Sequence, residues 1–596
     1  MTTKIDRFYK RRYKILGGPG CGKTTEILKM LKRNFESGMH FDQVLMIGFA
    51  KATVENLQDR AIHDKTLSLF LTEKQAQSIK TIHKFCKDHL SQFQIFNESA
   101  KKTFKDLIKT DPDNWPKLAD TNYDGTDLIA VGWTEEHDKK FGSIMNLIGL
   151  AKHSLGFEKA IKINGEYKIV KDPLQRIFHF YDEDPSYSRV RFKRPEISYV
   201  YKNFTRFKNH YQMIDFDDML EKSLVKNIEF KPYKLVLVDE AQDLSKLEWQ
   251  VISKIARNTE ELVLVGDDDQ SIYGWRGAKV ENILNFNHDY PETTIVRLEQ
   301  NYRSTKNILS AANAVISHNT DRLGKNLWTE EIEGEPISLY ASFNEHDEAR
   351  FISGTIDDWV KNGGMRDEVS VLYRSNAQSR VLEEALLRAQ IPYRIYGGQK
   401  FYERQEIRNA LAYLRLVVNR NDDAAFERIV NTPTRGIGDK TIEVLRGLAR
   451  GENISMWDAV KLAISGKNFT GRALSAVQAF MDLVNKLDKN FSDLSLPDQT
   501  DSVVTESGLI DFYRREKGDR GQSRIENLEE LVVACRAFEP DDAEQSALPQ
   551  FLDQAALDAG DKQAGKNEDA VQLMTLHSSK GLDFSIFFLA GMEENL

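Results

Sequence analysis

Cysteine is scarce in this sequence. Three cysteines, Cys21, Cys86 and Cys535, stand far apart in 596 residues, and none belongs to a CxxC pair. This excludes a disulfide framework, a zinc ribbon and a cysteine-ligated iron–sulfur cluster. No apolar run approaches the roughly 20 residues that cross a bilayer, and the polar residues 1–7 lack the apolar core of a secretory signal. We therefore expect a cytoplasmic protein without a membrane partner.

An excess of basic charge is also missing. The chain has 91 Asp and Glu against 82 Lys and Arg, a formal net charge of −9, which gives no hint of nucleic-acid binding. A basic groove can nevertheless exist on an acidic protein. One basic cluster consists of Arg189, Arg191, Lys193, Arg194, Lys202, Arg206 and Lys208, opposed by Glu196. It is either a solvated helix face or a nucleic-acid contact.

The apolar runs are short and predict several domains, because 596 residues are too many for one hydrophobic core. Runs bounded by turn residues predict buried parallel strands at 13–16, 44–49, 235–238, 262–265 and 294–298. Amphipathic helical patterns follow several of these runs, for example at 26–35. A second set at 337–340, 369–373, 571–575 and 586–589 predicts a second sheet. This alternation predicts an α/β fold.

The strongest motif is a glycine-rich loop, Gly17-Gly18-Pro19-Gly20-Cys21-Gly22-Lys23-Thr24, which matches GxxxxGK[ST] in full. It leaves an apolar run and enters a helical pattern that starts near Thr25, the context that this motif requires. Glycines let backbone N–H groups turn inward around phosphate oxygens. Lys23 would reach the β- and γ-phosphates of ATP, and the Thr24 hydroxyl would bind Mg²⁺.

Two adjacent carboxylates, Asp239 and Glu240, follow the apolar run 235–238. Ligands of open α/β sheets bind at the carboxyl ends of the strands. Asp239 would hold Mg²⁺, and Glu240 would polarise the attacking water as general base. A solvated acidic turn is the alternative, which the phosphate-binding loop in the same chain disfavours.

Further segments carry a resemblance to a known family. Residues 265–278, VGDDDQSIYGWRGA, resemble motif III of superfamily 1A helicases, 299–304, EQNYRS, resemble motif IV, and 575–584, TLHSSKGLDF, resemble motif V. Residues 372–438 are very similar to the UvrD, Rep and PcrA helicases. The similarity spans nearly the whole chain in the right order and is weakest at 90–205 and 450–560. The chain thus resembles superfamily 1A DNA helicases of the UvrD/Rep/PcrA family.

The resemblance implies two RecA-like P-loop NTPase domains, each with a mainly helical insertion. Residues 1–90 and 205–300 would form the first domain, with 91–204 as its DNA-contacting insertion. Residues 301–397 and 563–596 would form the second, with 398–562 as its insertion. The implied activity is ATP-driven 3′→5′ movement on single-stranded DNA and unwinding at single-strand–duplex junctions, in a bacterial or phage-infected cell.

The resemblance also assigns residues to the ATP site. Gln270 would touch both the γ-phosphate and DNA, and Tyr302 would stack on adenine. Arg303 would neutralise charge that develops on the γ-phosphate. The implied catalytic set is Lys23, Asp239, Glu240, Gln270 and Arg303. Nucleotide contacts would come from Gly17 to Thr25, Tyr302, Arg303, Gly581 and Asp583. No glutamine precedes Gly17, so the usual adenine-reading residue is missing.

Aromatic residues near the predicted hydrolysis site would grip DNA. In this family such rings stack on bases, which needs no sequence reading and is worth ~1–3 kcal/mol per base. Core packing is the alternative for any one ring. The implied DNA-binding set is Phe49, Thr81, His83, Tyr273, Trp275, Arg276 and His577.

The sequence ends at Leu596, shortly after motif V, and no other segment resembles the arginine-bearing motif VI. We therefore expect a fragment that binds ATP but hydrolyses it poorly until a continuation or a second polypeptide supplies that motif. Two alternatives stay open at this point. One is a helicase subunit of a recombination complex, and the other is a non-hydrolysing DNA-binding fragment.

Overall fold

The structure is a computed structural model of the chain. It describes residues 11–49, 51–64, 67–69, 72, 79–110, 144–145, 147–149, 151–152, 159–163, 166–170, 173–183, 194–225, 228–274, 277–320, 322–396, 398–466, 471–491, 494–514, 516, 519–540, 545–560, 563–565 and 568–593. The chain divides into two compact units, Met1–Ser338 and Leu339–Leu596. Among the described residues, no helix combines the length and apolarity that crossing a membrane requires.

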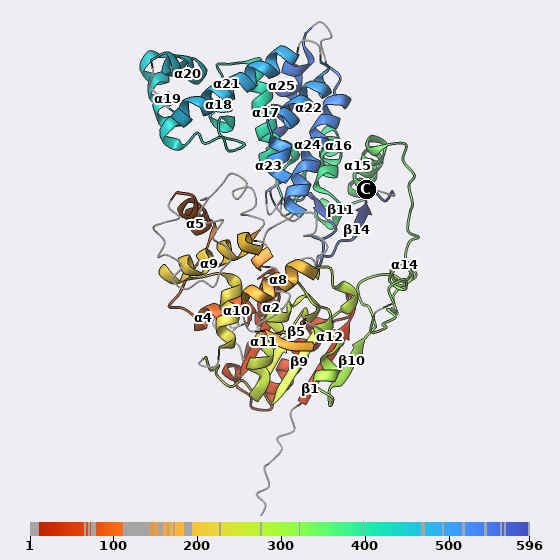
Figure 1. Ribbon diagram of the computed structural model, residues 1–596. Coiled ribbons are helices and arrows are strands. Elements are labelled where there is room, and N and C mark those ends of the chain that lie inside the picture. Colours follow the sequence, from red (N-terminus) through yellow and green to blue (C-terminus); the bar gives the residue numbers. More distant parts are fainter. Residues whose placement is uncertain are drawn as a thin grey trace, which may run out of the picture. The chain divides into compact units, whose positions relative to one another are not determined.

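The first unit is built on a parallel six-stranded sheet with the order β10-β1-β9-β8-β2-β3 (Figure 1). The strands are β1 (Arg11–Gly17), β2 (Val44–Gly48), β3 (Ile79–Thr81), β8 (Leu235–Val238), β9 (Glu261–Gly266) and β10 (Thr294–Leu298). Every residue of β2, β8 and β9 is buried, as expected for parallel strands covered on both faces. The five strands predicted for this part of the sequence are confirmed, and the short edge strand β3 is additional.

Alternate residues of each strand face two separate cores, because side chains of a strand point to opposite faces. Leu235 and Leu237 of β8 join one core with the helix α1 (Lys23–Glu36), whereas Val236 and Val238 join the other. The second core also contains α4 (Ile82–His89), α10 (Phe216–Leu224) and α11 (Lys246–Ile255). Helices on both faces make this part a doubly wound α/β domain. Further helices of the first unit are α2 (Lys51–His63), α12 (Glu281–Leu284), α13 (Phe286–Asp289) and α14 (Lys306–Ile316).

An insertion with its own core interrupts this domain. It contains α5 (Glu98–Thr110), the antiparallel pair β5 (Lys159–Ile163) and β6 (Glu166–Val170), α8 (Pro173–Glu183) and α9 (Arg194–His210). Phe104, Phe204 and Phe207 lie in its core. Strands β4 (Gln94–Ile95) and β7 (Met213–Ile214) pair where the chain enters and leaves the insertion.

The structure removes Lys208 from the basic surface cluster that the sequence predicted. Its side chain is 5% exposed and its ammonium pairs with Asp215 and Asp218. Nearby Lys152, also buried, lies 2.8 Å from Asp218. A buried ammonium needs an ionic partner, and Lys208 has two within the protein. It is therefore neither solvated nor available to DNA. Of the other members, Arg189, Arg191 and Lys193 lie outside the described residues.

The second unit contains a parallel four-stranded sheet with the order β12-β13-β11-β14. The strands are β11 (Val369–Tyr373), β12 (Tyr393–Ile395), β13 (Val571–Thr575) and β14 (Ile586–Leu589), packed with α15 (Glu345–Lys361) and α16 (Ser379–Arg388). Three predicted strands are confirmed. The strand predicted at 337–340 is wrong: this run forms no ladder, and Leu339 is 94% exposed. An apolar run becomes a strand only where a neighbour accepts its backbone hydrogen bonds.

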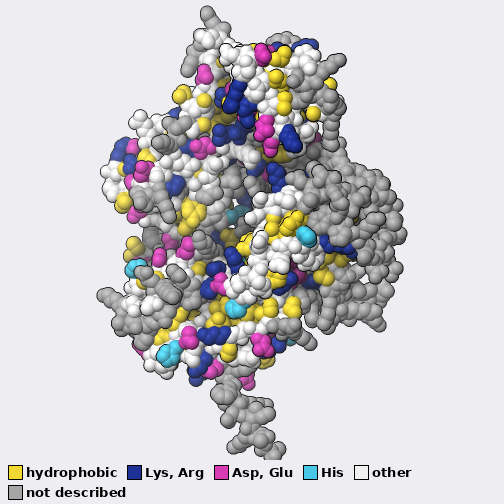
Figure 2. Space-filling view, turned by 90° about the vertical axis from the view of Figure 1, so that its left-hand side faces the viewer, with side chains coloured by type: hydrophobic (Ala, Val, Ile, Leu, Met, Phe, Trp, Pro, Cys, Tyr) yellow, Lys and Arg dark blue, Asp and Glu magenta, His cyan; other side chains and the backbone are white. Residues whose placement is uncertain are grey.

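A helical segment separates β12 from β13 and shares one core around α17 (Figure 1). Its helices are α17 (Gln405–Val418), α18 (Asp423–Ile429), α19 (Asp439–Glu452), α20 (Met456–Ser465), α21 (Gly471–Phe491), α22 (Leu496–Glu506), α23 (Leu509–Arg514), α24 (Asp519–Ala537) and α25 (Ala547–Gly560). Figure 2 shows Lys and Arg side chains gathered on one face over this segment. Local basic surface thus exists on a chain that is acidic overall.

Arg404 ties the helical segment to the sheet of the second unit. Its guanidinium donates to the Asn376 carbonyl at 2.8 Å, to Asn527 Oδ1 at 2.9 Å and to Ser379 Oγ at 2.6 Å. Glu383 lies 3.6 Å away, and both side chains are almost fully buried. Burial raises the pKa of Glu383, and Arg404 opposes this shift. One side chain therefore joins the loop after β11, α16 and α24.

We expect Arg404→Met to lower the opening free energy of α17 and α24 by about 3–5 kcal/mol, because Glu383 loses its buried cation. Native-state hydrogen exchange measures this energy amide by amide. Arg446→Met is the control, because Arg446 pairs with Glu427 where both side chains are more than a third exposed. That exposed pair should contribute at most about 1 kcal/mol. Equal losses in the two variants would contradict the role given to Arg404.

Candidate active site

Three strand ends bring the predicted site residues of the first unit together. Strand β9 lies between β1 and β8, and the register pairs Leu16 with Gly266 and Val238 with Leu264. The chain therefore leaves the three strands at one edge, through the glycine-rich loop, Asp267 and Asp239. Ligands of parallel sheets bind at this edge.

The glycine-rich loop has the backbone shape of a phosphate cradle. Gly20 and Gly22 have φ of 70° and 78°, a region that favours glycine, and α1 begins at Lys23. Lys23 Nζ donates to the carbonyls of Gly17 at 2.9 Å and Gly18 at 3.3 Å. The ammonium thus lies over the loop, and the helix N-terminus adds partial positive charge. Anionic phosphate oxygens fit this arrangement.

The other residues of the glycine-rich loop differ in burial and in their hydrogen bonds. The Thr24 side chain is half-buried, whereas Thr25 is exposed and its hydroxyl accepts from Arg60 at 3.4 Å. Cys21 is buried, and burial raises the pKa of its thiol, so the thiol stays protonated and weakly reactive. The carbonyl of Pro19 accepts a hydrogen bond from Asn301.

Asp239 and Glu240 follow β8 in a constrained turn. Asp239 is 5% exposed, and burial, reinforced by Glu240, raises its pKa to about 7, against the opposing charge of Lys23. The backbone N–H of Glu240 donates to Asp239 Oδ1 at 2.9 Å, and Glu240 has φ of 53°. A divalent cation beside Asp239 would favour its ionised form. Asp239 and the Thr24 hydroxyl supply the oxygen donors that Mg²⁺ prefers.

Gln242 links the acidic pair to the loop after β9. This fully buried side chain donates from Nε2 to Glu240 Oε2, and its Oε1 accepts from the backbone N–H of Asp267 at 3.0 Å. A Cβ at Gly266 would lie 2.5 Å from Gln242 Oε1, so glycine is required there. Gln242 therefore holds the general-base candidate and the motif III loop in a fixed relation.

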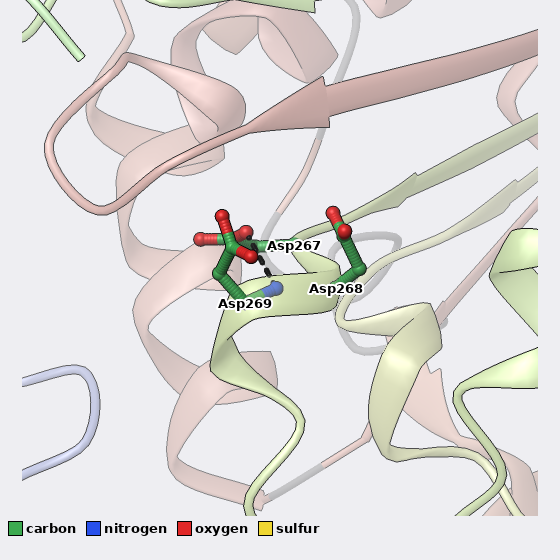
Figure 3. Close-up of side chains that lie close together, drawn as sticks. All are labelled: Asp267, Asp268 and Asp269. Carbon is green, nitrogen blue, oxygen red and sulfur yellow. Dashed lines mark hydrogen bonds between the residues drawn. The ribbon is translucent and has the colours of Figure 1, made fainter. Parts of the chain in front are cut away.

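Asp267, Asp268 and Asp269 bring their carboxylates within 4.8 Å of one another (Figure 3). A metal ion does not fit among them, because Lys325 Nζ takes the cation position, 2.8 Å from Asp267, 3.4 Å from Asp269 and in contact with Asp268. Arg322 also binds Asp269 through two hydrogen bonds, at 2.9 and 2.6 Å. The cluster is thus an ionic network in which two cations, Lys325 and Arg322, offset most of the charge of three carboxylates. Gln270 Nε2 donates to one of its members, Asp267 Oδ2, at 2.6 Å.

Asn301 fixes the backbone of Arg303 against the glycine-rich loop. Its buried side chain donates to the Pro19 carbonyl at 2.7 Å, and its Oδ1 accepts from the backbone N–H groups of Arg303 at 2.8 Å and Ser304 at 2.7 Å. A Cβ at Gly20 would lie 2.6 Å from Arg303 Cβ, so the two segments of the chain are in close contact. The first unit includes this segment, because it extends to Ser338.

Tyr302 stands on the same segment but faces outward. Its backbone N–H donates to the Gly20 carbonyl at 3.1 Å, whereas its side chain is 66% exposed. The hydroxyl donates to Gln300 Oε1 at 2.8 Å. The ring therefore presents an exposed face next to the loop, as stacking on a base would require.

The predicted DNA-binding residues are brought together only in part. Phe49 and Tyr273 are half-buried and stacked, with ring centroids 5.8 Å apart and planes 25° apart. His83 lies 3.6 Å from Glu248 and edge-on to Phe216. Thr81 caps α4, where its hydroxyl accepts from the Lys84 backbone N–H at 3.3 Å.

The remaining predicted residues are not part of this arrangement. Trp275 and Arg276 lie outside the described residues. His577, Gly581 and Asp583 belong to the second unit, on the loop between β13 and β14. Gly581 has φ of 85°, so glycine suits this position.

Sequence reasoning assigned no role to Gln242, Asn301 or Lys325. Gln242 and Asn301 stand within or beside recognised motifs, and this position could have marked them as site residues. Their hydrogen bonds were not predictable from the sequence. Lys325 stands in no recognised motif, and 57 residues separate it from Asp268. No sequence pattern points to it.

We expect Asn301→Ala to lower the free energy of unfolding by about 1–3 kcal/mol, because the Pro19 carbonyl and two backbone N–H groups lose their partner. It should also weaken binding of a fluorescent nucleotide roughly tenfold, which corresponds to about 1.4 kcal/mol. Asn282→Ala is the control, because the buried Asn282 amide bonds to the Leu244 carbonyl at 2.9 Å, outside the glycine-rich loop. Thermal unfolding and fluorescence titration measure both effects. Equal nucleotide affinity in both variants would refute the role given to Asn301.

Comparison with known proteins gives the family. Residues 2–291 match the model of the UvrD/REP helicase N-terminal domain, and residues 296–596 match that of the UvrD-like helicase C-terminal domain. The chain is 57% identical to DNA helicase II of Escherichia coli over 363 residues, which cover 61% of this chain and 50% of that protein.

Other relatives agree with this match. The chain is 52% identical to DNA helicase II of Haemophilus influenzae over 394 residues, 64% of this chain and 54% of that protein. It is 39% identical to the ATP-dependent DNA helicase PcrA of Staphylococcus epidermidis over 426 residues, 70% of this chain and 58% of that protein. The matched regions thus cover about half the length of these relatives. Because two family models together match almost the entire sequence, the chain belongs to the UvrD-like family of helicases.

Proposed function

We propose that this chain is the motor part of an ATP-dependent DNA helicase that moves 3′→5′ along single-stranded DNA. One observation carries the proposal: the glycine-rich loop, the Asp239–Glu240 pair and Gln270 follow three adjacent parallel strands at one sheet edge. The relatives named DNA helicase II and ATP-dependent DNA helicase PcrA support DNA as the substrate.

Hydrolysis would use groups of the first unit. Lys23 would leave the loop carbonyls and bind the β- and γ-phosphates, because phosphate oxygens carry more negative charge than carbonyls. Glu240, held by Gln242, would accept the proton of the attacking water. Thr24 and Asp239 would hold Mg²⁺, which supplies positive charge to the phosphates when bound. Arg303 would stabilise charge developing on the γ-phosphate.

The short chain between Gln270 and Tyr273 suggests how hydrolysis is coupled to DNA. Gln270 would sense the γ-phosphate, and three residues later the Tyr273 ring stacks on Phe49. A shift of this loop would move a base-stacking ring together with the phosphate sensor. Trp275 and Arg276 would add further contacts, as would Thr81 at the end of β3 and His83 in α4.

The rest of the proposed motor lies in the second RecA-like domain and the two insertions. We propose the division 1–90 with 205–300, 91–204, 301–397 with 563–596, and 398–562, which counts 301–338 with the second domain although this segment belongs to the first compact unit. Gly581 and Asp583 would add nucleotide contacts, and His577 would contact the strand. ATP binding and release would alternate the grip of the two domains on the strand.

Strand displacement tests this proposal directly. We expect the protein, alone or with the second polypeptide expected from the sequence, to unwind duplexes with a 3′ single-stranded tail and not those with a 5′ tail. Single-stranded DNA should stimulate its ATP hydrolysis. Hydrolysis without any DNA stimulation would refute a helicase motor. DNA binding without hydrolysis would instead favour the non-hydrolysing alternative.

We expect Lys23→Ala to lower DNA-stimulated ATP hydrolysis by at least about 10²-fold, because the transferring phosphate loses a fixed positive charge. Affinity for single-stranded DNA should stay within about twofold, because phosphate contact and base stacking are separate interactions. Lys29→Ala on the same helix is the control, because the Lys29 side chain is exposed and pairs with Glu26. A coupled ATPase assay and fluorescence anisotropy measure the two quantities. An unchanged hydrolysis rate in Lys23→Ala would contradict the assignment.

We expect Tyr273→Ala to weaken single-stranded DNA binding by ~1–3 kcal/mol, because one stacking surface is lost. Affinity for ATP should change less than affinity for DNA. Tyr290→Ala is the matched control, because the Tyr290 ring packs on Phe286 in the core side of the same unit. Anisotropy titrations with an oligonucleotide measure the effect. If Tyr273→Ala lowers the melting temperature and leaves DNA affinity intact, the ring is a packing residue.

A further inference from the structure

Residues 322–328 connect two parts of the active site that are distant in sequence. Lys325, in the middle of this connecting segment, is 1% exposed at its side chain and faces the three carboxylates after β9. Leu327, two residues later, packs against the glycine-rich loop, where a Cβ at Gly18 would lie 2.6 Å from Leu327 Cδ2. One short stretch of chain thus touches the γ-phosphate sensor loop and the phosphate cradle.

On the sensor side, Lys325 fixes Asp267. The Asp267 carboxylate meets Lys325 Nζ at 2.8 Å, the Gln270 side-chain amide at 2.6 Å and the backbone N–H of Asp269 at 3.1 Å. Gln270 therefore donates to the Asp267 carboxylate, and the position of this carboxylate depends on the Lys325 ammonium. Burial alone would lower the pKa of Lys325, but Asp267 and Asp268 more than offset this and raise it, so the ammonium stays charged.

On the cradle side, the connecting segment supports Arg303. The Trp328 carbonyl accepts from the Asn301 backbone N–H at 2.7 Å, and the Trp328 N–H donates to the Glu299 carbonyl at 3.1 Å. Asn301 in turn binds Pro19 and the backbone of Arg303. The position of Arg303 therefore depends on where the connecting segment is anchored.

We propose that Lys325 is a positioning residue for ATP hydrolysis, whose ammonium anchors the connecting segment to Asp267 and so keeps Gln270 and Arg303 in one fixed arrangement. This role rests on the proposed function. Lys325 is buried against Asp267 and Asp268 and acts through Asp267 and the backbone of 322–328. Misplacement of a catalytic group by 1 Å can cost about 10²-fold in rate, so this anchor matters for catalysis.

Lys325→Met keeps the length of the side chain and removes its charge. We expect the turnover number of DNA-stimulated hydrolysis to fall by about 10²-fold, because Gln270 and Arg303 lose their common anchor. The KM for ATP should change by less than about threefold, because the glycine-rich loop and Lys23 stay in place. A merely structural role would lower the amount of folded enzyme and leave the turnover of the folded fraction unchanged.

Lys152→Met is the matched control. Lys152 is also a buried ammonium facing three carboxylates, with Asp218 at 2.8 Å, Glu221 at 3.7 Å and Asp215 at 3.9 Å. It should lose stability to a similar degree, with turnover per folded molecule unchanged. A drop in turnover as large as that of Lys325→Met would overturn the proposal, because any buried ion pair would then have the same effect.

A double variant separates positioning from charge balance. Asp268→Asn combined with Lys325→Met removes one negative charge together with the positive one, so the stability lost in Lys325→Met should be largely recovered. We expect turnover to stay low, because Asp267 still lacks its ammonium partner. Recovery of turnover together with stability would show that Lys325 only neutralises charge, and would overturn the proposal.

Hydrogen exchange gives a readout that needs no activity. In Lys325→Met, amides of Asp269, Gln270, Asn301 and Tyr302 should exchange faster, whereas Lys152→Met should leave them unchanged. Unchanged exchange at both loops would overturn the proposal whatever the ATPase result. Absence of DNA-stimulated hydrolysis in the unmodified protein would instead refute the proposed function, and the exchange data would still decide the role of Lys325.

Discussion

The register among β1, β9 and β8 is the constraint on which the site depends. Because the three strands are parallel and adjacent, the loops after Gly17, Gly266 and Val238 leave the sheet at the same edge, with β8 ending two residues before β9. The two cores on either face of the sheet hold that register. A shift of one residue would turn every core side chain of a strand to the wrong face, so the packing that stabilises the domain also aligns the chemistry.

Two buried aspartates at this sheet edge, Asp268 and Asp239, have different electrostatic environments. At Asp268, burial would raise the pKa, but Lys325 and the Leu323 N–H hold it below its usual value, so the ionic network is complete within the protein. At Asp239, burial and Glu240 raise the pKa to about 7, and Lys23 compensates only partly. One acidic group is thus satisfied by the fold, whereas a bound cation would relieve the unfavourable burial of the other. The contrast distinguishes an aspartate that stabilises the scaffold, Asp268, from an aspartate that is a candidate cation ligand, Asp239.

Those parts of the site whose chemistry fixes both residue type and spacing could be predicted from the sequence. The glycine-rich loop, the Asp239–Glu240 pair and most strands are of this kind, because each follows from contacts that are local in sequence. Lys325 was not predictable, because its partners stand more than 50 residues away. The strand expected at 337–340 failed because a strand depends on a neighbour that no local pattern specifies. For Lys208, a signal existed: its carboxylate partners stand 7 and 10 residues further along the chain.

Glu240 adopts a left-handed backbone conformation, with φ of 53°. For a residue with a Cβ this conformation costs roughly 1–2 kcal/mol, whereas glycine adopts it freely. Glycine at position 240 would relieve this strain, but it would also remove the carboxylate beside Asp239 and the acceptor of the buried Gln242 amide. Selection for turnover and the hydrogen bond from Gln242 would therefore both keep glutamate at this position in spite of its strained backbone.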